Sequence, residues 1–219
     1  MEDKARYEIT LLGDSFVGKT CLTKMYVNGT FEREYYPTLD FEQKSVNKRY
    51  PLCLGEVKVV INDTSGKALK IIHKLSIERA DAIIICYDAT NRDSFDNIKT
   101  KWYPLIQEYK KKDLILGIVS TKNEFKDLKK VNDEEGLNLA KEYKAIFQKT
   151  IIPDKDTVDD IFLRIGRLCL GEEDYIPEKI SEEKEIEKPL NKDKNPKKDW
   201  EEEIFNPERK NKKCYCCPQ

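Results

Sequence analysis

Short apolar runs alternate with stretches of helical spacing from about residue 6 to residue 170. Uninterrupted apolar runs, such as AIIICY and LILGIV, are typical of central parallel strands that are covered on both faces. Strands are expected at residues 7–14, 81–90, 113–121 and 145–152, with a hairpin at 41–62. The alternation predicts a doubly wound α/β fold: six mostly parallel strands, one antiparallel strand at an edge, and helices on both flanks.

Helices are predicted between these strands from apolar residues that recur every three or four positions. They are expected at residues 19–27, 94–111, 132–145 and 156–170. Pro104 lies inside the second of these stretches and should bend or interrupt it, because proline has no N–H to donate. Asn132 is expected to cap the third helix, whose first turn is acidic.

The composition changes after Gly171, where charged residues and prolines replace the apolar pattern. We therefore expect a folded domain at residues 1–171 and a charged, disordered tail at 172–219. The net charge of −1 gives no argument for a nucleic-acid partner, and the single histidine excludes a multi-histidine metal site. No apolar run approaches the roughly 20 residues that span a bilayer, and the start is not a secretory signal. The chain is expected in the cytosol unless something attaches it to a membrane.

Residues 13–20, GDSFVGKT, fit the phosphate-loop pattern G-x-x-x-x-G-K-[ST]. This phosphate loop follows a predicted strand and opens a predicted helix, so backbone N–H groups and the helix N-terminus would converge on phosphate oxygens. Lys19 would reach the β- and γ-phosphates, and the Thr20 hydroxyl would hold Mg²⁺. The bulky side chain of Phe16 must then point outward. The alternative is an ordinary glycine turn.

The order of motifs resembles the Ras superfamily of small GTPases, and within it the Rab branch. The resemblance covers about residues 6–170 and rests on LLGDSFVGKTCL, FEREYYPT, DTSG, ERADAIIICYDATNRDSFDNIK, EEGLNLAKEY and the terminal cysteines. The segment KWYPLI is more similar to the Rho branch. The resemblance implies a switch in vesicle trafficking that binds GTP or GDP with Mg²⁺.

The resemblance also implies a set of site residues. Those expected to contact the nucleotide are Gly13, Asp14, Ser15, Phe16, Val17, Gly18, Lys19, Thr20, Cys21, Phe31, Thr38, Asp63, Gly66, Thr121, Lys122, Glu124, Thr150, Ile151 and Ile152. Phe31 would stack on the guanine, and the Gly66 N–H would contact the γ-phosphate. Thr20, Thr38 and Asp63 would hold Mg²⁺, because hard oxygen ligands suit that ion. Without the resemblance, the segment around Thr38 would be an unremarkable exposed turn.

Two motifs depart from the family pattern. Lys67 stands where the family has the glutamine that orients the attacking water, and lysine has no acceptor for a water proton. We therefore expect slow hydrolysis. Lys19 and Thr38 are the other residues that the resemblance assigns to catalysis. Alternatively, Lys67 faces solvent and a partner supplies the missing group. Glu124 replaces the base-reading aspartate and displaces its carboxylate by one methylene, which predicts retained guanine preference with reduced affinity.

Two further departures concern other parts of the family pattern. TIIP, at residues 150–153, aligns with the family's TSAK, so Ile152 could still offer its N–H to the guanine oxygen, although Pro153 replaces the lysine. Asn62 stands where Rab proteins have a tryptophan of the effector surface, so the usual Rab partners cannot be carried over.

The C-terminus joins a small basic cluster at 209–213 to Cys214, Cys216 and Cys217. This arrangement is similar to prenylated Rab ends and to a four-residue prenylation box, and two anchors would hold the protein stably on a membrane. We expect a monomer on the cytoplasmic face of an intracellular membrane with a soluble cytosolic pool. An exchange factor, a prenyl-binding chaperone and effectors would be its partners. The alternative is a metal-binding or frayed cysteine cluster.

Two other functions stay open. The altered motifs are compatible with a membrane adaptor built on a G domain that holds GTP persistently or binds no nucleotide. A phosphate-loop enzyme that phosphorylates a small acceptor is the third possibility, but the sequence has no arginine-rich lid segment for a second phosphate substrate.

Overall fold

The computed structural model describes residues 5–31, 41–50, 56–152 and 154–172. Within these residues, six strands form one sheet in the order β2-β3-β1-β4-β5-β6. The strands are β1 (Arg6–Leu12), β2 (Phe41–Arg49), β3 (Glu56–Thr64), β4 (Ala82–Asp88), β5 (Ile115–Thr121) and β6 (Ile146–Lys149). Only the β2–β3 pair is antiparallel, and β2 lies at an edge. The predicted fold class is therefore confirmed.

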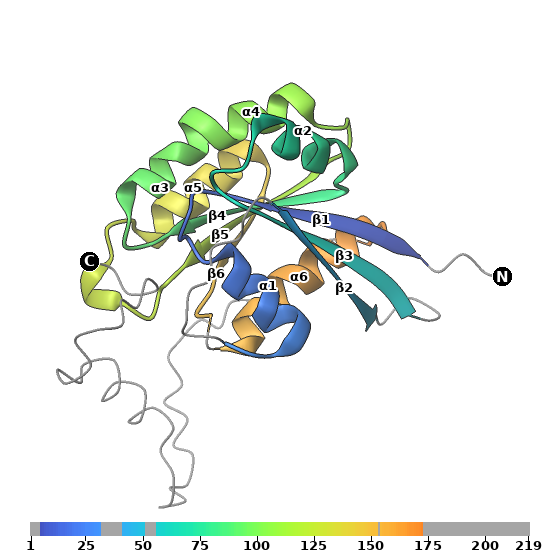
Figure 1. Ribbon diagram of the computed structural model, residues 1–219. Helices are drawn as coiled ribbons and strands as arrows, with labels where there is room; N and C mark the ends of the chain where they lie inside the picture. Colours follow the sequence, from blue (N-terminus) through green and yellow to red (C-terminus); the bar gives the residue numbers. More distant parts are fainter. Residues whose placement is uncertain (1–4, 32–40, 51–55, 153, 173–219) are drawn as a thin grey trace, which may run out of the picture. The chain divides into compact units, whose positions relative to one another are not determined.

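Helices cover both faces of this sheet (Figure 1). They are α1 (Lys19–Asn28), α2 (Lys70–Arg79), α3 (Arg92–Asn97), a π-helical turn η1 (Ile98–Trp102), α4 (Tyr103–Tyr109), a 3₁₀ turn η2 (Lys126–Leu128), α5 (Asp133–Tyr143) and α6 (Lys155–Cys169). Helices α1 and α6 lie below the sheet in the view of Figure 1, and α2 to α5 lie above it. None of the helices in the described part of the chain is both long and apolar enough to cross a membrane.

Each face of the sheet has its own hydrophobic core, as the strand period of two requires. In β4, Ile84 belongs to the core beneath α1 and α6, whereas Ile83 and Ile85 belong to the core beneath α3 and α4. All three side chains are fully buried. The continuous apolar run in this strand thus reflects coverage on both faces, as the sequence predicted.

The helical stretch that contains Pro104 is interrupted, as predicted. Pro104 lies in the first turn of α4, directly after the π-helical turn η1. The wider π-helical turn accommodates Pro104, which has no N–H to donate to the preceding turn. Asn132 occupies the predicted N-cap of α5, and its own N–H donates to Glu135 Oε1 at 3.1 Å.

Helix α2 was not predicted, because two polar residues on it face the core and two apolar residues face solvent. His73 and Ser76 are buried, whereas Ile71 and Leu75 are exposed. The polar groups that point inward therefore hide the helical period in the sequence.

Candidate nucleotide-binding site

The segments that the sequence assigned to a nucleotide site meet beyond the carboxyl ends of the parallel strands. The phosphate loop follows β1, the DTSG segment ends β3, the TKNE segment follows β5 and the TIIP segment follows β6. In open α/β sheets, ligands bind at this edge. The fold thus brings together residues that are more than 100 positions apart in the chain.

The phosphate loop adopts a backbone conformation that depends on its glycines. Gly13 and Gly18 have φ angles of 141° and 95°, and a Cβ on Gly13 would lie 2.3 Å from the Cys86 carbonyl oxygen. Phe16 also has a positive φ, 68°, which costs an aromatic residue conformational energy. Its side chain is 43% exposed, so the outward orientation predicted from the sequence is confirmed.

Lys19 is folded back over the phosphate loop at the start of α1. Its Nζ donates to the Gly13 carbonyl at 2.9 Å and to the Asp14 carbonyl at 2.7 Å. The side chain is buried, and this burial lowers the pKa of Lys19. The ammonium group thus lies against two carbonyls of the phosphate loop at the N-terminus of α1, and a helix N-terminus suits phosphate oxygens.

Two of the three predicted Mg²⁺ ligands lie side by side. The Thr20 hydroxyl donates to Asp63 Oδ2 at 2.6 Å, and burial raises the pKa of Asp63, although this hydrogen bond and the charge of Lys19 oppose the rise. Thr38 lies outside the described residues. No group of three or more His, Cys, Asp or Glu in the described segments could hold a metal ion. A hydroxyl beside a carboxylate fits Mg²⁺, which takes its other oxygens from phosphates and water.

Gly66 packs directly on the backbone of the phosphate loop. It lies in a turn closed by the Ala68 N–H, which donates to the Ser65 carbonyl at 3.0 Å. A Cβ on Gly66 would lie 2.3 Å from the Ser15 nitrogen, so only glycine can sit this close. Lys67, in the same turn, is exposed, as the solvent-facing alternative expected. The turn therefore places the Gly66 backbone against the phosphate loop, while the Lys67 side chain faces solvent.

The TKNE segment is fixed by buried hydrogen bonds. Thr121 Oγ1 lies 2.6 Å from the Val17 carbonyl of the phosphate loop and 2.9 Å from the Tyr87 carbonyl. Lys122 has a φ of 58°, and its Nζ lies 2.7 Å from Asp88 Oδ2 in a nearly buried ion pair. These contacts hold the segment after β5 against the phosphate loop.

Glu124 carries an acceptor that fits a ring edge with N–H donors. Its Oε2 is buried and has no hydrogen-bond partner among the described residues, and burial raises the pKa of this carboxyl. A buried acceptor without a partner costs free energy unless a ligand supplies donors. The guanine edge offers such donors, so the residue present fits the base that the family implies.

The segment after β6 contacts the TKNE segment and the phosphate loop. Asn123, which the sequence reasoning did not assign, donates from Nδ2 to the Ser120 carbonyl at 2.9 Å and to the Thr150 carbonyl at 3.0 Å, joining the two segments. Ile152 is 3% exposed, and its Cδ1 lies 3.0 Å from the position of a Cβ on Gly18. Ile151 donates its N–H to Thr157 Oγ1 at 3.1 Å.

Several predicted residues lie at the margin of this arrangement or outside it. Phe31 and Cys21 are half-buried and pack against the core shared by α1 and α6. Pro153 and the three terminal cysteines lie outside the described residues. The sequence reasoning also missed Asn97, Lys101 and Trp102 of the α3–α4 region, which approach Asp14 of the phosphate loop. The Rho-like segment KWYPLI was the available signal, because it contains the last two of them.

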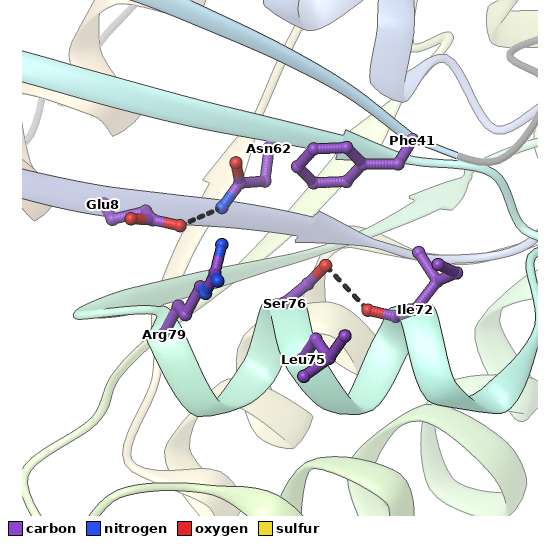
Figure 2. A pocket seen from close by; sticks show the side chains of 7 residues that line it. All are labelled: Glu8, Phe41, Asn62, Ile72, Leu75, Ser76 and Arg79. Carbon is purple, nitrogen blue, oxygen red and sulfur yellow. Dashed lines mark hydrogen bonds between the residues drawn. The ribbon is translucent and has the colours of Figure 1, made fainter.

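A separate pocket of about 140 Å³ lies between α2 and the β2–β3 edge of the sheet (Figure 2). It is lined by Glu8, Phe41, Asn62, Ile72, Leu75, Ser76 and Arg79. Asn62 is buried here and donates from Nδ2 to Glu8 Oε1 at 2.6 Å, while Gln43 donates to its Oδ1 at 2.8 Å. The residue that replaces the Rab tryptophan therefore makes part of the pocket polar.

Comparisons with known proteins agree with this geometry. The Ras family model matches residues 8–170. Ras-related protein Rab-26 from Rattus norvegicus is 34% identical over 163 residues, which cover 74% of this chain and 62% of the relative. Ras-related protein Rab-37 from Mus musculus is 31% identical over 162 residues, covering 73% and 71%. Ras-related protein Rab-8B from Homo sapiens is 31% identical over 164 residues, covering 74% and 77%.

The chain thus spans less than two thirds of the length of the first relatives that it matches. The match nevertheless includes every described segment of the candidate site. The chain belongs to the Ras family of small GTPases and is similar to its Rab members.

Proposed function

We propose that this protein is a Rab-like molecular switch that binds GTP or GDP with Mg²⁺ and hydrolyses GTP slowly. The observation that carries the proposal is the junction of Thr20 and Asp63, 2.6 Å apart, with Gly66 packed on the phosphate loop beside them. One end of the site then suits a metal-bound phosphate. The buried acceptor of Glu124 suits the base at the other end.

In this function, different residues of the site contact the phosphates, the γ-phosphate alone and Mg²⁺. Lys19 and the N–H groups of the phosphate loop bind the β- and γ-phosphates, and the Gly66 N–H contacts only the γ-phosphate. Thr20 and Asp63 would hold Mg²⁺, which would supply positive charge to the phosphate oxygens. Loss of the γ-phosphate releases Gly66, and this change distinguishes the two states of a switch.

Hydrolysis requires a water oxygen to attack the γ-phosphorus while the bond to the β-phosphate oxygen breaks, giving GDP and phosphate. Positioning and charge stabilisation supply most of the acceleration in this reaction. Lys67 is exposed and has no acceptor for a water proton, so the chain itself orients the water poorly. We therefore expect slow turnover and a long-lived GTP-bound state.

The first test is a titration of the full-length protein with GTP, GDP, ATP and XTP in the presence of Mg²⁺. Tight binding of GTP and GDP, at least a hundredfold tighter than ATP, supports the proposal. XTP carries an oxygen in place of the guanine amine and should bind weakly, because Glu124 would face an acceptor. Equal affinity for all four nucleotides, or none, would refute it.

The second test concerns the rate of hydrolysis. Single-turnover cleavage of bound GTP should be faster in Lys67→Gln than in the natural protein, by about tenfold or more, since positioned water is worth orders of magnitude. Lys74→Gln is the control, because it makes the same change of charge at another lysine. Lys74 is half-buried on α2, where it pairs with Glu78 at 3.8 Å. An unchanged rate in Lys67→Gln would mean that Lys67 does not limit hydrolysis.

The same proposal includes attachment to the cytoplasmic face of an intracellular membrane through prenylated Cys214, Cys216 and Cys217, and a role in vesicle trafficking. The Rab relatives and the basic residues before the cysteines support it. The enzymatically prenylated full chain should sediment with anionic vesicles, whereas the triple cysteine-to-serine variant should not. Equal sedimentation would refute the anchor.

The polar Asn62 in the pocket beside α2 suggests effectors unlike those that use the Rab tryptophan.

A further inference from the structure

A three-way junction joins α3, the phosphate loop and the Gly66 turn. Its centre is the carboxylate of Asp14, a residue of the phosphate loop. Asn97 donates from Nδ2 to Asp14 Oδ2 at 2.6 Å, and the Trp102 indole N–H donates to Oδ1 at 3.0 Å. Two neutral donors from the α3–α4 region thus hold this side chain, and with it the phosphate loop.

Lys101 extends this junction to the Gly66 turn. Its Nζ donates to the Gly66 carbonyl at 3.3 Å and lies 3.7 Å from Asp14 Oδ1. The ammonium also lies 4.1 Å from the centre of the Trp102 ring, which attracts a cation. This side chain of η1 therefore contacts the Gly66 turn, the phosphate loop and the Trp102 ring.

The π-helical turn η1 gives its two lysines different partners. Lys99 and Lys101 are two residues apart and so project from roughly opposite sides of the helix. Lys99 Nζ lies 3.3 Å from Glu142 of α5, away from the Gly66 turn. Both side chains are about half exposed, at 53% and 48%. They form a matched pair that differs in what the ammonium contacts.

We propose that Lys101 is a positioning residue that holds the Gly66 turn on the phosphate loop and thereby favours GTP over GDP. This inference rests on the proposed function. A Gly66 residue whose carbonyl is already held loses less freedom when its N–H binds a γ-phosphate, so less of the binding free energy is spent on ordering the turn. GDP has no γ-phosphate and gains nothing from the restraint.

The first experiment compares the ratio of affinities for GDP and a non-hydrolysable GTP analogue in full-length Lys101→Met, Lys101→Arg and Lys99→Met, with Mg²⁺. In Lys101→Met the affinity for the GTP analogue should fall about fivefold relative to GDP, which is ~1 kcal/mol. The half-exposed site argues against a larger effect. Lys101→Arg should keep most of the ratio, and Lys99→Met should leave it within twofold. The same ratio in all variants of a protein that binds nucleotide would overturn the proposal.

The second experiment separates this inference from the proposed function. Amide hydrogen exchange of residues 65–68 is measured without nucleotide, with the same variants. Exchange should rise several-fold in Lys101→Met and stay unchanged in Lys99→Met. Unchanged exchange in Lys101→Met overturns the proposal even if guanine nucleotides bind. A natural protein that binds no guanine nucleotide refutes the proposed function, whereas faster exchange in Lys101→Met would still support the restraint on the turn.

Discussion

The buried imidazole of His73 should make the folded protein less stable in mild acid. His73 lies on α2, is 4% exposed and meets the Trp102 ring edge-on, with ring centres 5.3 Å apart. Its Nδ1 is buried without a hydrogen-bond partner among the described residues. Burial first, and then the charges of Lys101 and Lys19, lower the pKa of His73 from 6.5 to about 4.

The direction of the effect follows from proton binding. Between pH 6.5 and about 4, the unfolded chain binds a proton at His73 that the folded protein resists, so stability rises with pH in this window. The contribution of neutral His73 is complete above pH 6.5 and is lost as the pH falls towards 4. With 1.36 kcal/mol for each pKa unit, the loss between pH 7 and pH 4.5 is about 2 kcal/mol.

The assay is urea unfolding of the natural protein and of His73→Phe at pH 7, 6, 5 and 4.5. Phenylalanine keeps an aromatic ring against Trp102 but cannot titrate. Any packing difference is independent of pH and cancels when the change with pH is compared, as do the titrations of carboxyl groups common to both proteins. The unfolding free energy of the natural protein should therefore fall by about 2 kcal/mol more than that of the variant. Parallel pH profiles would refute the reasoning.

Three further changes test the site itself. Phe16→Gly should raise the unfolding free energy by up to about 1 kcal/mol in urea, because it removes the strain of a positive φ while glycine adds entropy to the unfolded chain; a large loss of stability would contradict this. Gly66→Ala should weaken binding of a GTP analogue at least tenfold and of GDP less than twofold, since its Cβ cannot approach the Ser15 nitrogen at 2.3 Å; equal losses would show that the turn does not sense the γ-phosphate. Glu124→Asp restores the family's carboxylate and should tighten GTP binding about tenfold in a competition titration; weaker binding would mean that the loop has adapted to glutamate.

Local patterns in the sequence were sufficient for much of the fold and for the phosphate loop. The continuous apolar runs of the buried strands and the proline in the α3–α4 stretch are patterns within a few residues, so they can be recognised without a partner. The phosphate loop was equally recognisable, because Gly13, Gly18 and Lys19 lie in one continuous segment, where the lysine side chain folds back on the glycine loop. The assignments of Thr38 and of the terminal cysteines fall outside the described residues and stay predictions.

Other features had no local signature. Helix α2 was missed because it buries His73 and Ser76 and exposes Leu75, a pattern that makes sense only beside the neighbours of the helix. Asn123 was missed because its role is to join two segments that are distant in the chain: it donates to the Ser120 carbonyl in β5 and to the Thr150 carbonyl after β6.

The sequence by itself thus determined the order of the strands and of the helices other than α2, the phosphate loop, and the substitutions at Lys67 and Glu124. Only the tertiary structure decided that Asp14 is held by Trp102 from 88 positions away, and that Lys101 reaches the Gly66 carbonyl. The physical reason is that a backbone conformation depends on neighbouring residues, whereas a hydrogen bond between distant segments exists only once the sheet has fixed where those segments lie.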